Sequence, residues 1–197
     1  EREVPFELKL LSSDEPENGA DFARLWPLQH MPLLLDGDAA VCESSIIIEH
    51  LDLHHGAAAP MISREGNEAL SVRFLDRVFD NYVMTPMQRI VFGFTRSPET
   101  RDPTGVAAAR ELLDRAYAWL DGELPRTAWA HGAAFSLADC AGASALLYAD
   151  WVHSIPDHFA NLQGYRRRLL ARSSVVRVID EARPDRGFFP PGAPDRD

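Results

Sequence analysis

The sequence predicts a small α/β domain over residues 1–55 followed by an all-α domain over residues 63–183. Three observations lead to this fold class. Short strand-like runs, an Asp-Gly turn and one apolar helix fill the first part of the chain. Residues 56–62 contain a glycine, three alanines and a proline, which is typical of a linker. Beyond residue 63 the apolar residues recur at helical spacing, so helices alone are expected there.

The first domain is expected to alternate strands and helices. Residues from Phe6 to Leu11 alternate apolar and polar side chains, as a strand with one covered face does. Asp36-Gly37-Asp38 separates two short apolar runs, and glycine supplies the positive φ of a tight hairpin turn. The expected elements are a strand over 6–11, a loop over 12–19, a short helix over 21–26, strands over 33–35 and 39–42, and a helix from Glu43 to about Leu53.

The second domain is expected to consist of amphipathic helices. Ser63 is the expected cap of the first, Pro86 should kink or break it, and Ser136 with Asp139 resembles a capping box. The consecutive arginines 166–168 are expected on a solvated face, and the tail 184–197, rich in proline, is expected to be extended. The remaining helices are expected over 105–124, from 137 to about 151, over 162–171 and over 173–183.

Composition excludes several classes of function. The 197 residues include 20 Lys and Arg against 30 Asp and Glu, which gives a formal net charge of −10. This balance argues against nucleic-acid binding and against attachment to anionic lipid by charge. No apolar run is long enough to span a membrane. Two cysteines imply no disulfide framework, so a reducing compartment is the default.

Two short segments carry the candidate binding chemistry. Pro32 precedes a predicted strand and is a candidate cis peptide, which would leave the Met31 backbone free to pair with an extended peptide. Glu43 and Ser44 open a predicted helix, where the backbone N–H groups and the serine hydroxyl can hold a carboxylate. Glu43 can hold an ammonium group. Each segment also has a plain structural interpretation, namely an ordinary trans proline and ordinary helix caps.

Together these segments resemble the glutathione S-transferase superfamily of the cytosolic type. The resemblance rests on the proline, the Asp-Gly hairpin, Glu-Ser and the isoleucine-rich helix that ends in Glu-His-Leu-Asp, and on the motif over 135–139. It implies a thioredoxin-like N-terminal domain, a helical-bundle C-terminal domain and glutathione as co-substrate. Glu43 and Ser44 would hold the γ-glutamyl end, and Met31 would pair with the cysteinyl unit ahead of cis Pro32. His30 stands near the expected place of the glycine carboxylate.

The resemblance also implies an activity and an assembly. The family activates the glutathione thiol, whose free pKa is about 8.5, for attack on a small electrophile. In the family, the residue that does so lies in a first strand and helix that would precede the point where this sequence begins, so the catalytic residue is unknown. A homodimer, a cytoplasmic location and a role in detoxification are implied. Tyr82, Met87 and Trp151 are candidates for the wall of the second-substrate site, with core packing as the alternative. A non-catalytic binding or regulatory protein on the same scaffold is the other functional interpretation.

A histidine-rich helix end raises the question of a metal. His50 and His54 are four residues apart, and Asp52 and His55 lie beside them. No matching cluster elsewhere in the sequence completes a site. We therefore expect no metal, and we interpret the histidines as a basic helix end that the helix dipole favours.

Overall fold

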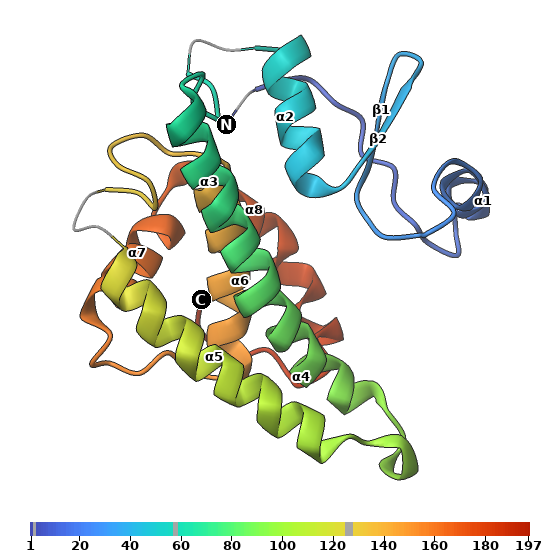
Figure 1. Ribbon diagram of the computed structural model, residues 1–197. Coiled ribbons are helices and arrows are strands. Elements are labelled where there is room, and N and C mark those ends of the chain that lie inside the picture. The colour runs from blue at the N-terminus through green and yellow to red at the C-terminus, as the bar shows by residue number, and fades with distance from the viewer. Residues whose placement is uncertain (2, 57–58, 125–127) are drawn as a thin grey trace. The chain divides into compact units, whose positions relative to one another are not determined.

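The computed structural model describes residues 1, 3–56, 59–124 and 128–197. They form two compact units, Glu1–Ile62 and Ser63–Asp197 (Figure 1). The predicted linker, 56–62, lies partly outside the described residues, so its conformation as a whole remains a prediction.

The first unit is organised around a β-hairpin. Strand β1 (Leu33–Asp36) pairs antiparallel with β2 (Ala39–Cys42), with Leu33 opposite Cys42 and Asp36 opposite Ala39. Gly37 has a φ of +59°, a value that a residue with a side chain rarely adopts. The hairpin predicted from the Asp-Gly turn is confirmed.

Two helices accompany the hairpin. Helix α1 (Pro16–Leu25) begins within the segment that was expected to be a loop. Pro16 explains the earlier start, because the fixed φ and the missing N–H of proline suit the first turn of a helix. Helix α2 (Ser44–His54) follows β2 directly, and it covers the segment where a helix was predicted.

The strand expected over residues 6–11 is absent from the structure. The segment has no regular secondary structure, and the side chains of Phe6 and Leu8 are 80% and 71% exposed. Among the described residues the sheet contains β1 and β2 alone. The alternating pattern was compatible with a strand, but a strand is stable only when a neighbouring backbone takes its hydrogen bonds and a core covers one face.

The second unit is helical and is built around α6. Helix α6 (Leu137–Val152) packs against α3, α4, α7 and the π-helical segment that joins α3 to α4. Its buried face includes Leu146 and Ala149, which expose no surface. The other elements are α3 (Gly66–Val78), the π-helix (Phe79–Met84), α4 (Thr85–Thr95), α5 (Pro103–Glu123), α7 (Ala160–Leu170) and α8 (Ser173–Ala182), with 3-10 turns at Pro98–Thr100 and Arg183–Phe188.

Pro86 lies in the first turn of α4, directly after the π-helix. Proline cannot donate the hydrogen bond that a continuous α-helix needs at this point, so the α-helical pattern is interrupted as predicted. The chain nevertheless continues through the wider π turn, and Figure 1 shows α3 and α4 following one another end to end.

Two predicted details of the second unit were wrong. The cap of α3 is Glu65, whose carboxylate accepts a hydrogen bond from the Glu68 N–H at 2.9 Å, while Ser63 donates its hydroxyl to the Glu68 carboxylate. The tail is not extended throughout: it begins with a 3-10 turn, and Arg196 reaches back to the carboxylate of Asp150. The proline content favours an extended tail, but it does not show that Asp150 is close enough to pair with Arg196.

Arg166 departs from the solvated face expected for residues 166–168. It is buried and forms an ion pair with the buried Asp150 at 3.1 Å. Burial lowers the pKa of Arg166, and the Asp150 carboxylate opposes this effect. In the part of the chain that the structure describes, no helix is both long and apolar enough to cross a membrane.

Candidate functional site

The predicted binding segments meet at one end of the hairpin. Met31 and Pro32 lead into β1, whereas Glu43 and Ser44 follow β2. Because Leu33 pairs with Cys42, the two segments leave the ladder side by side. The Met31–Pro32 peptide bond is cis, as the sequence suggested, and the Met31 side chain is 73% exposed.

Glu43 has an unusual backbone conformation at the start of α2. Its φ is +70° and its ψ is 123°, and its carbonyl accepts the first helical hydrogen bond, from the Ile47 N–H at 2.9 Å. A positive φ is uncommon for a residue with a side chain, and such residues cluster at functional sites. The Glu43 side chain makes no capping hydrogen bond. The capping explanation for Glu43 therefore does not hold in this structure.

Glu43, Ser44 and His30 are all exposed. The first N–H groups of any α-helix have no partner within the helix, so the start of α2 offers donors next to two exposed polar side chains. His30 follows a turn in which the Gln29 N–H donates to the Trp26 carbonyl at 2.9 Å and Gln29 has a φ of +53°. Together these residues can offer hydrogen-bond donors to the carboxylate of a small zwitterion, and the Glu43 carboxylate to its ammonium group.

The three residues proposed for a second-substrate wall lie in different environments. Tyr82 is 51% exposed on the π-helix. Met87 is 4% exposed and belongs to the core. Trp151 packs edge to face against Tyr148 and Phe189, with ring centroids 5.2 Å apart in both pairs. The structure thus places Met87 where the packing alternative puts it, and the roles of Tyr82 and Trp151 remain predictions.

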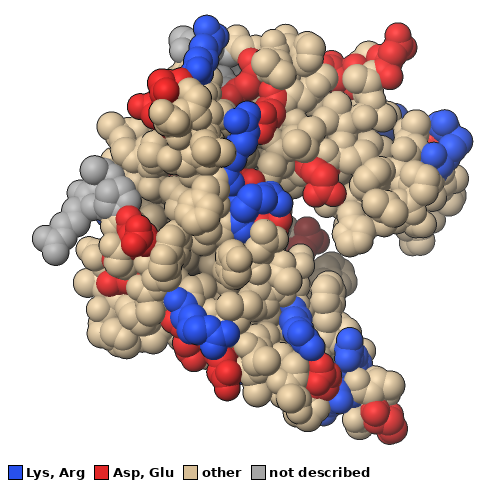
Figure 2. All heavy atoms as spheres, in the orientation of Figure 1, with Lys and Arg blue, Asp and Glu red and all other residues tan. Residues whose placement is uncertain are grey.

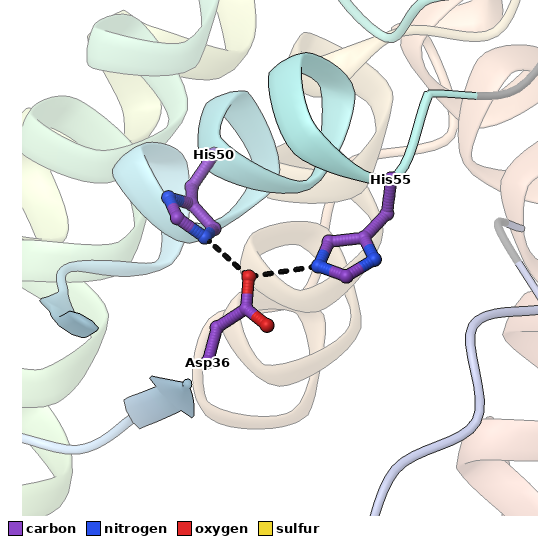
Figure 3. A group of neighbouring side chains, drawn as sticks. All are labelled: Asp36, His50 and His55. Atoms are coloured by element: carbon purple, nitrogen blue, oxygen red, sulfur yellow. Dashed lines mark hydrogen bonds and ion pairs between the residues drawn. The ribbon is translucent and has the colours of Figure 1, made fainter. Parts of the chain in front are cut away.

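A second cluster of polar side chains lies beyond the other end of the hairpin (Figure 3). The Nε2 atoms of His50 and His55 each lie 2.7 Å from the same oxygen of Asp36, Oδ2. Hydrogen bonds from His55 and then His50 lower the pKa of the Asp36 carboxyl. The expectation that the histidines lack a complementary group was wrong. Asp36 was expected to belong to the turn. Neither residue spacing nor composition indicated that its carboxylate would contact histidines at the end of α2.

Charge is distributed without a dominant patch on the face shown in Figure 2. Basic and acidic side chains alternate there with large areas of uncharged surface. This view agrees with the mixed charges and the acidic balance of the sequence.

Two family models match the chain. The glutathione S-transferase N-terminal domain matches residues 1–53, and the glutathione S-transferase C-terminal domain matches residues 83–173. The chain belongs to the glutathione S-transferase superfamily. The predicted fold class, a thioredoxin-like domain followed by a helical domain, is confirmed by the same matches.

Individual relatives agree with the family. The chain is 29% identical over 184 residues to glutathione S-transferase GstB of Escherichia coli O6:H1, covering 91% of this chain and 88% of that protein. A glutathione S-transferase from Methylobacillus flagellatus, crystallised with glutathione bound, has a TM-score of 0.77 at 23% identity, covering 88% of this chain and 86% of that one. One from Methylobacterium radiotolerans, in complex with glutathione sulfonate, has a TM-score of 0.69 at 24% identity, with coverages of 79% and 74%.

Proposed function

We propose that this member of the glutathione S-transferase superfamily binds glutathione at the end of the hairpin and activates its thiol for attack on a small electrophile. The observation that carries the proposal is the juxtaposition of Met31–Pro32 with Glu43–Ser44, which the register of β1 and β2 imposes. Glutathione presents an α-ammonium and an α-carboxylate at one end and an extended peptide beyond them. The two segments offer complementary groups in the same order.

The γ-glutamyl end of glutathione is assigned to the start of α2. The Ser44 hydroxyl and the first N–H groups of the helix donate to the α-carboxylate, and the positive end of the helix dipole favours its charge. The exposed Glu43 carboxylate accepts from the α-ammonium group. Because the Glu43 side chain makes no capping hydrogen bond, binding would not require it to leave a partner in the helix.

The cysteinyl unit is assigned to Met31. The ladder ends at the pair Leu33 and Cys42, so the backbone of Met31 lies beyond the last paired residue of β1. An extended peptide can therefore add its own N–H and C=O groups to this backbone, as an additional strand does. His30, which precedes Met31, is assigned to the glycine carboxylate.

The proposed chemistry is attack by the glutathione thiolate. A thiol with a pKa of about 8.5 is mostly protonated at neutral pH, so a hydrogen-bond donor aimed at the sulfur must lower that pKa. The second substrate would then rest on the helical domain, for which Tyr82 and Trp151 are the proposed contacts. In line with the family, we propose a homodimer that acts in the cytoplasm in detoxification.

Calorimetric titration with glutathione tests the binding site. We expect Ser44→Ala to weaken binding by roughly tenfold, since a hydrogen bond to a charged group is worth about 1.5 kcal/mol or more. Ser173→Ala is the matched control, because Ser173 is also an exposed first residue of a helix and belongs to the other unit. If both variants bind glutathione equally well, or if Ser44→Ala lowers stability with unchanged affinity, the site assignment is wrong.

Turnover is tested separately from binding. Formation of a thioether from glutathione and an activated aryl chloride supports the transferase assignment. Saturable binding of glutathione with no product for a panel of aryl halides, epoxides, peroxides and disulfides favours the alternative, a non-catalytic binding or regulatory protein. The two measurements distinguish a wrong binding site from a wrong reaction.

A further inference from the structure

The cluster of Asp36, His50 and His55 is separate from the residues assigned to glutathione. Asp36 ends β1, His50 lies in the last half of α2, and His55 follows the last residue of that helix. The glutathione residues precede β1 and begin α2, at the opposite ends of both elements. The cluster therefore has no part in the proposed function above.

The donor atoms of the three side chains converge. Both imidazole Nε2 atoms lie 2.7 Å from Oδ2 of Asp36, and the three atoms lie within 4.8 Å of one another. In Figure 3 the two rings approach the carboxylate from α2 and from the residue after it, with the carboxylate between them. Two imidazole nitrogens and one carboxylate oxygen therefore face a common volume.

This set of donors is one that transition metals prefer. Imidazole suits zinc, copper, iron and nickel, and two histidines with one carboxylate are a recurring set of three protein ligands. We propose that Asp36, His50 and His55 form a binding site for a divalent first-row transition metal ion, with Zn²⁺ as the reference ion.

The distances are compatible with a metal after small side-chain movements. Ligands of tetrahedral zinc, each about 2.0–2.1 Å from the ion, lie about 3.3 Å apart. The nitrogen–oxygen distances of 2.7 Å are shorter than this, so the ion requires each ring to move away from Oδ2 by a fraction of an ångström. The side chains of Asp36, His50 and His55 are 30%, 16% and 35% exposed, which gives an ion access and leaves room for water as a further ligand.

The alternative is a purely hydrogen-bonded cluster, in which each neutral histidine donates an Nε2–H to Asp36. The two arrangements need opposite tautomers, because a metal requires an unprotonated Nε2 atom. Metal binding to such a site would exchange two hydrogen bonds for three coordination bonds. The measured response to metal therefore distinguishes the two arrangements.

The test uses the full chain without a histidine tag, after dialysis against a chelator. Titration with Zn²⁺ is expected to show one ion bound per chain, and Co²⁺ is expected to give the visible absorption of an ion with nitrogen and oxygen ligands. His55→Gln is the first variant, because His55 lies outside the helix and its replacement leaves α2 intact. We expect it to weaken Zn²⁺ binding by at least tenfold, as should His50→Gln and Asp36→Asn, since even an outer-shell partner of a metal is worth roughly 10–100-fold.

Two control variants address non-specific binding. His158→Gln removes an exposed histidine from the other unit and should leave Zn²⁺ binding unchanged. His54→Gln removes an exposed ring whose centroid is 4.4 Å from that of His50 but which does not belong to the cluster of Asp36, His50 and His55. Most of the Zn²⁺ affinity should remain in this variant. Circular dichroism of each variant verifies folding.

The proposal is overturned by either of two results. One is the absence of a one-to-one binding step for Zn²⁺ and Co²⁺ in the folded protein. The other is binding that His55→Gln and Asp36→Asn leave at the level of the His158→Gln control. Both results would identify the cluster as hydrogen-bonded only. Neither result bears on glutathione affinity, so failure here is distinguishable from failure of the proposed function.

Discussion

Replacement of Asp139 by asparagine tests how much the buried hydrogen bonds of this carboxylate stabilise the helical unit. The Asp139 side chain belongs to the capping box of α6 and is 0% exposed. Its Oδ1 atom accepts hydrogen bonds from the Ala130 N–H and the Tyr165 hydroxyl, both at 2.8 Å. Its Oδ2 atom accepts from the Ser136 N–H at 2.9 Å and from the Ser136 hydroxyl at 3.0 Å. One carboxylate therefore joins the start of α6 to α7 and to the segment before the helix.

The expected loss in the free energy of unfolding depends on how many hydrogen-bond donors lose their acceptor. Asparagine retains one oxygen, which is best placed at the Oδ1 position, so its NH₂ group faces the Ser136 N–H. One buried backbone donor then has no acceptor, at a cost of about 1–3 kcal/mol, and the remaining hydrogen bonds lose the strength that the charge gave them. Removal of the buried charge offsets part of this loss. We expect Asp139→Asn to lower the free energy of unfolding by about 2–4 kcal/mol, and Asp139→Ala by about 4 kcal/mol or more.

The assay is urea unfolding followed by circular dichroism at several protein concentrations. The matched control is Asp157→Asn, an exposed aspartate of the same unit, which should change the free energy of unfolding by less than about 0.5 kcal/mol. If Asp139→Asn is as stable as this control, with an unchanged dependence of the unfolding free energy on urea, the four hydrogen bonds do not stabilise the unit.

Three further predictions test other parts of the fold. Gly142→Ala should destabilise the helical unit by about 1–3 kcal/mol, because the added Cβ would lie 2.9 Å from the Tyr165 hydroxyl and 3.1 Å from the Phe79 ring; wild-type stability in urea would show that these rings can move aside. Burial, followed by nearby carboxylates, raises the pKa of the Tyr117 hydroxyl in the folded protein. Above about pH 10 the hydroxyl ionises in the unfolded chain but not in the folded one, so the stability that the neutral Tyr117 contributes below this pH is lost as the pH rises. Tyr117→Phe should therefore reduce the decline of the unfolding free energy above about pH 10, and a decline parallel to that of the wild type would contradict this assignment. Gly37→Ala should cost about 1–2 kcal/mol and speed amide exchange in β1 and β2, because the residue has a φ of +59°; unchanged exchange would mean that the turn adapts.

Local chemistry made some elements predictable from sequence. The turn at Gly37 and the capping box of Ser136 and Asp139 depend on residues within four positions of one another, so their signals are complete in a short segment. The interruption before Pro86 is equally local, because it follows from one missing N–H. Met31, Pro32, Glu43 and Ser44 could be named as binding candidates for the same reason, since they flank a hairpin whose register brings them together. Their assignment to glutathione, and that of His30, came from the resemblance to the family and remains a prediction.

Other features depended on partners distant in sequence. Residues 6–11 alternate as a strand does, but alternation does not supply a neighbouring strand. Arg166 belongs to an arginine run that is typical of a surface, yet it is buried against Asp150. The sequence assigns Asp36 to the turn, but in the structure its carboxylate contacts His50 of α2. In each case the deciding contact is tertiary, and a pattern within one segment cannot encode it.

The two proposed sites share the same two elements, and this limits how they can influence one another. Ser44 and His50 are separated by six residues of α2, or about 9 Å along the helix axis. This is close to the screening length at physiological salt, so the charge of a metal ion at His50 would act only weakly on a carboxylate at Ser44. Any coupling would instead have to pass through the position of α2 relative to β1, which the metal would fix at one end and glutathione would contact at the other. Such coupling would be reciprocal, because each ligand must change the affinity for the other by the same factor.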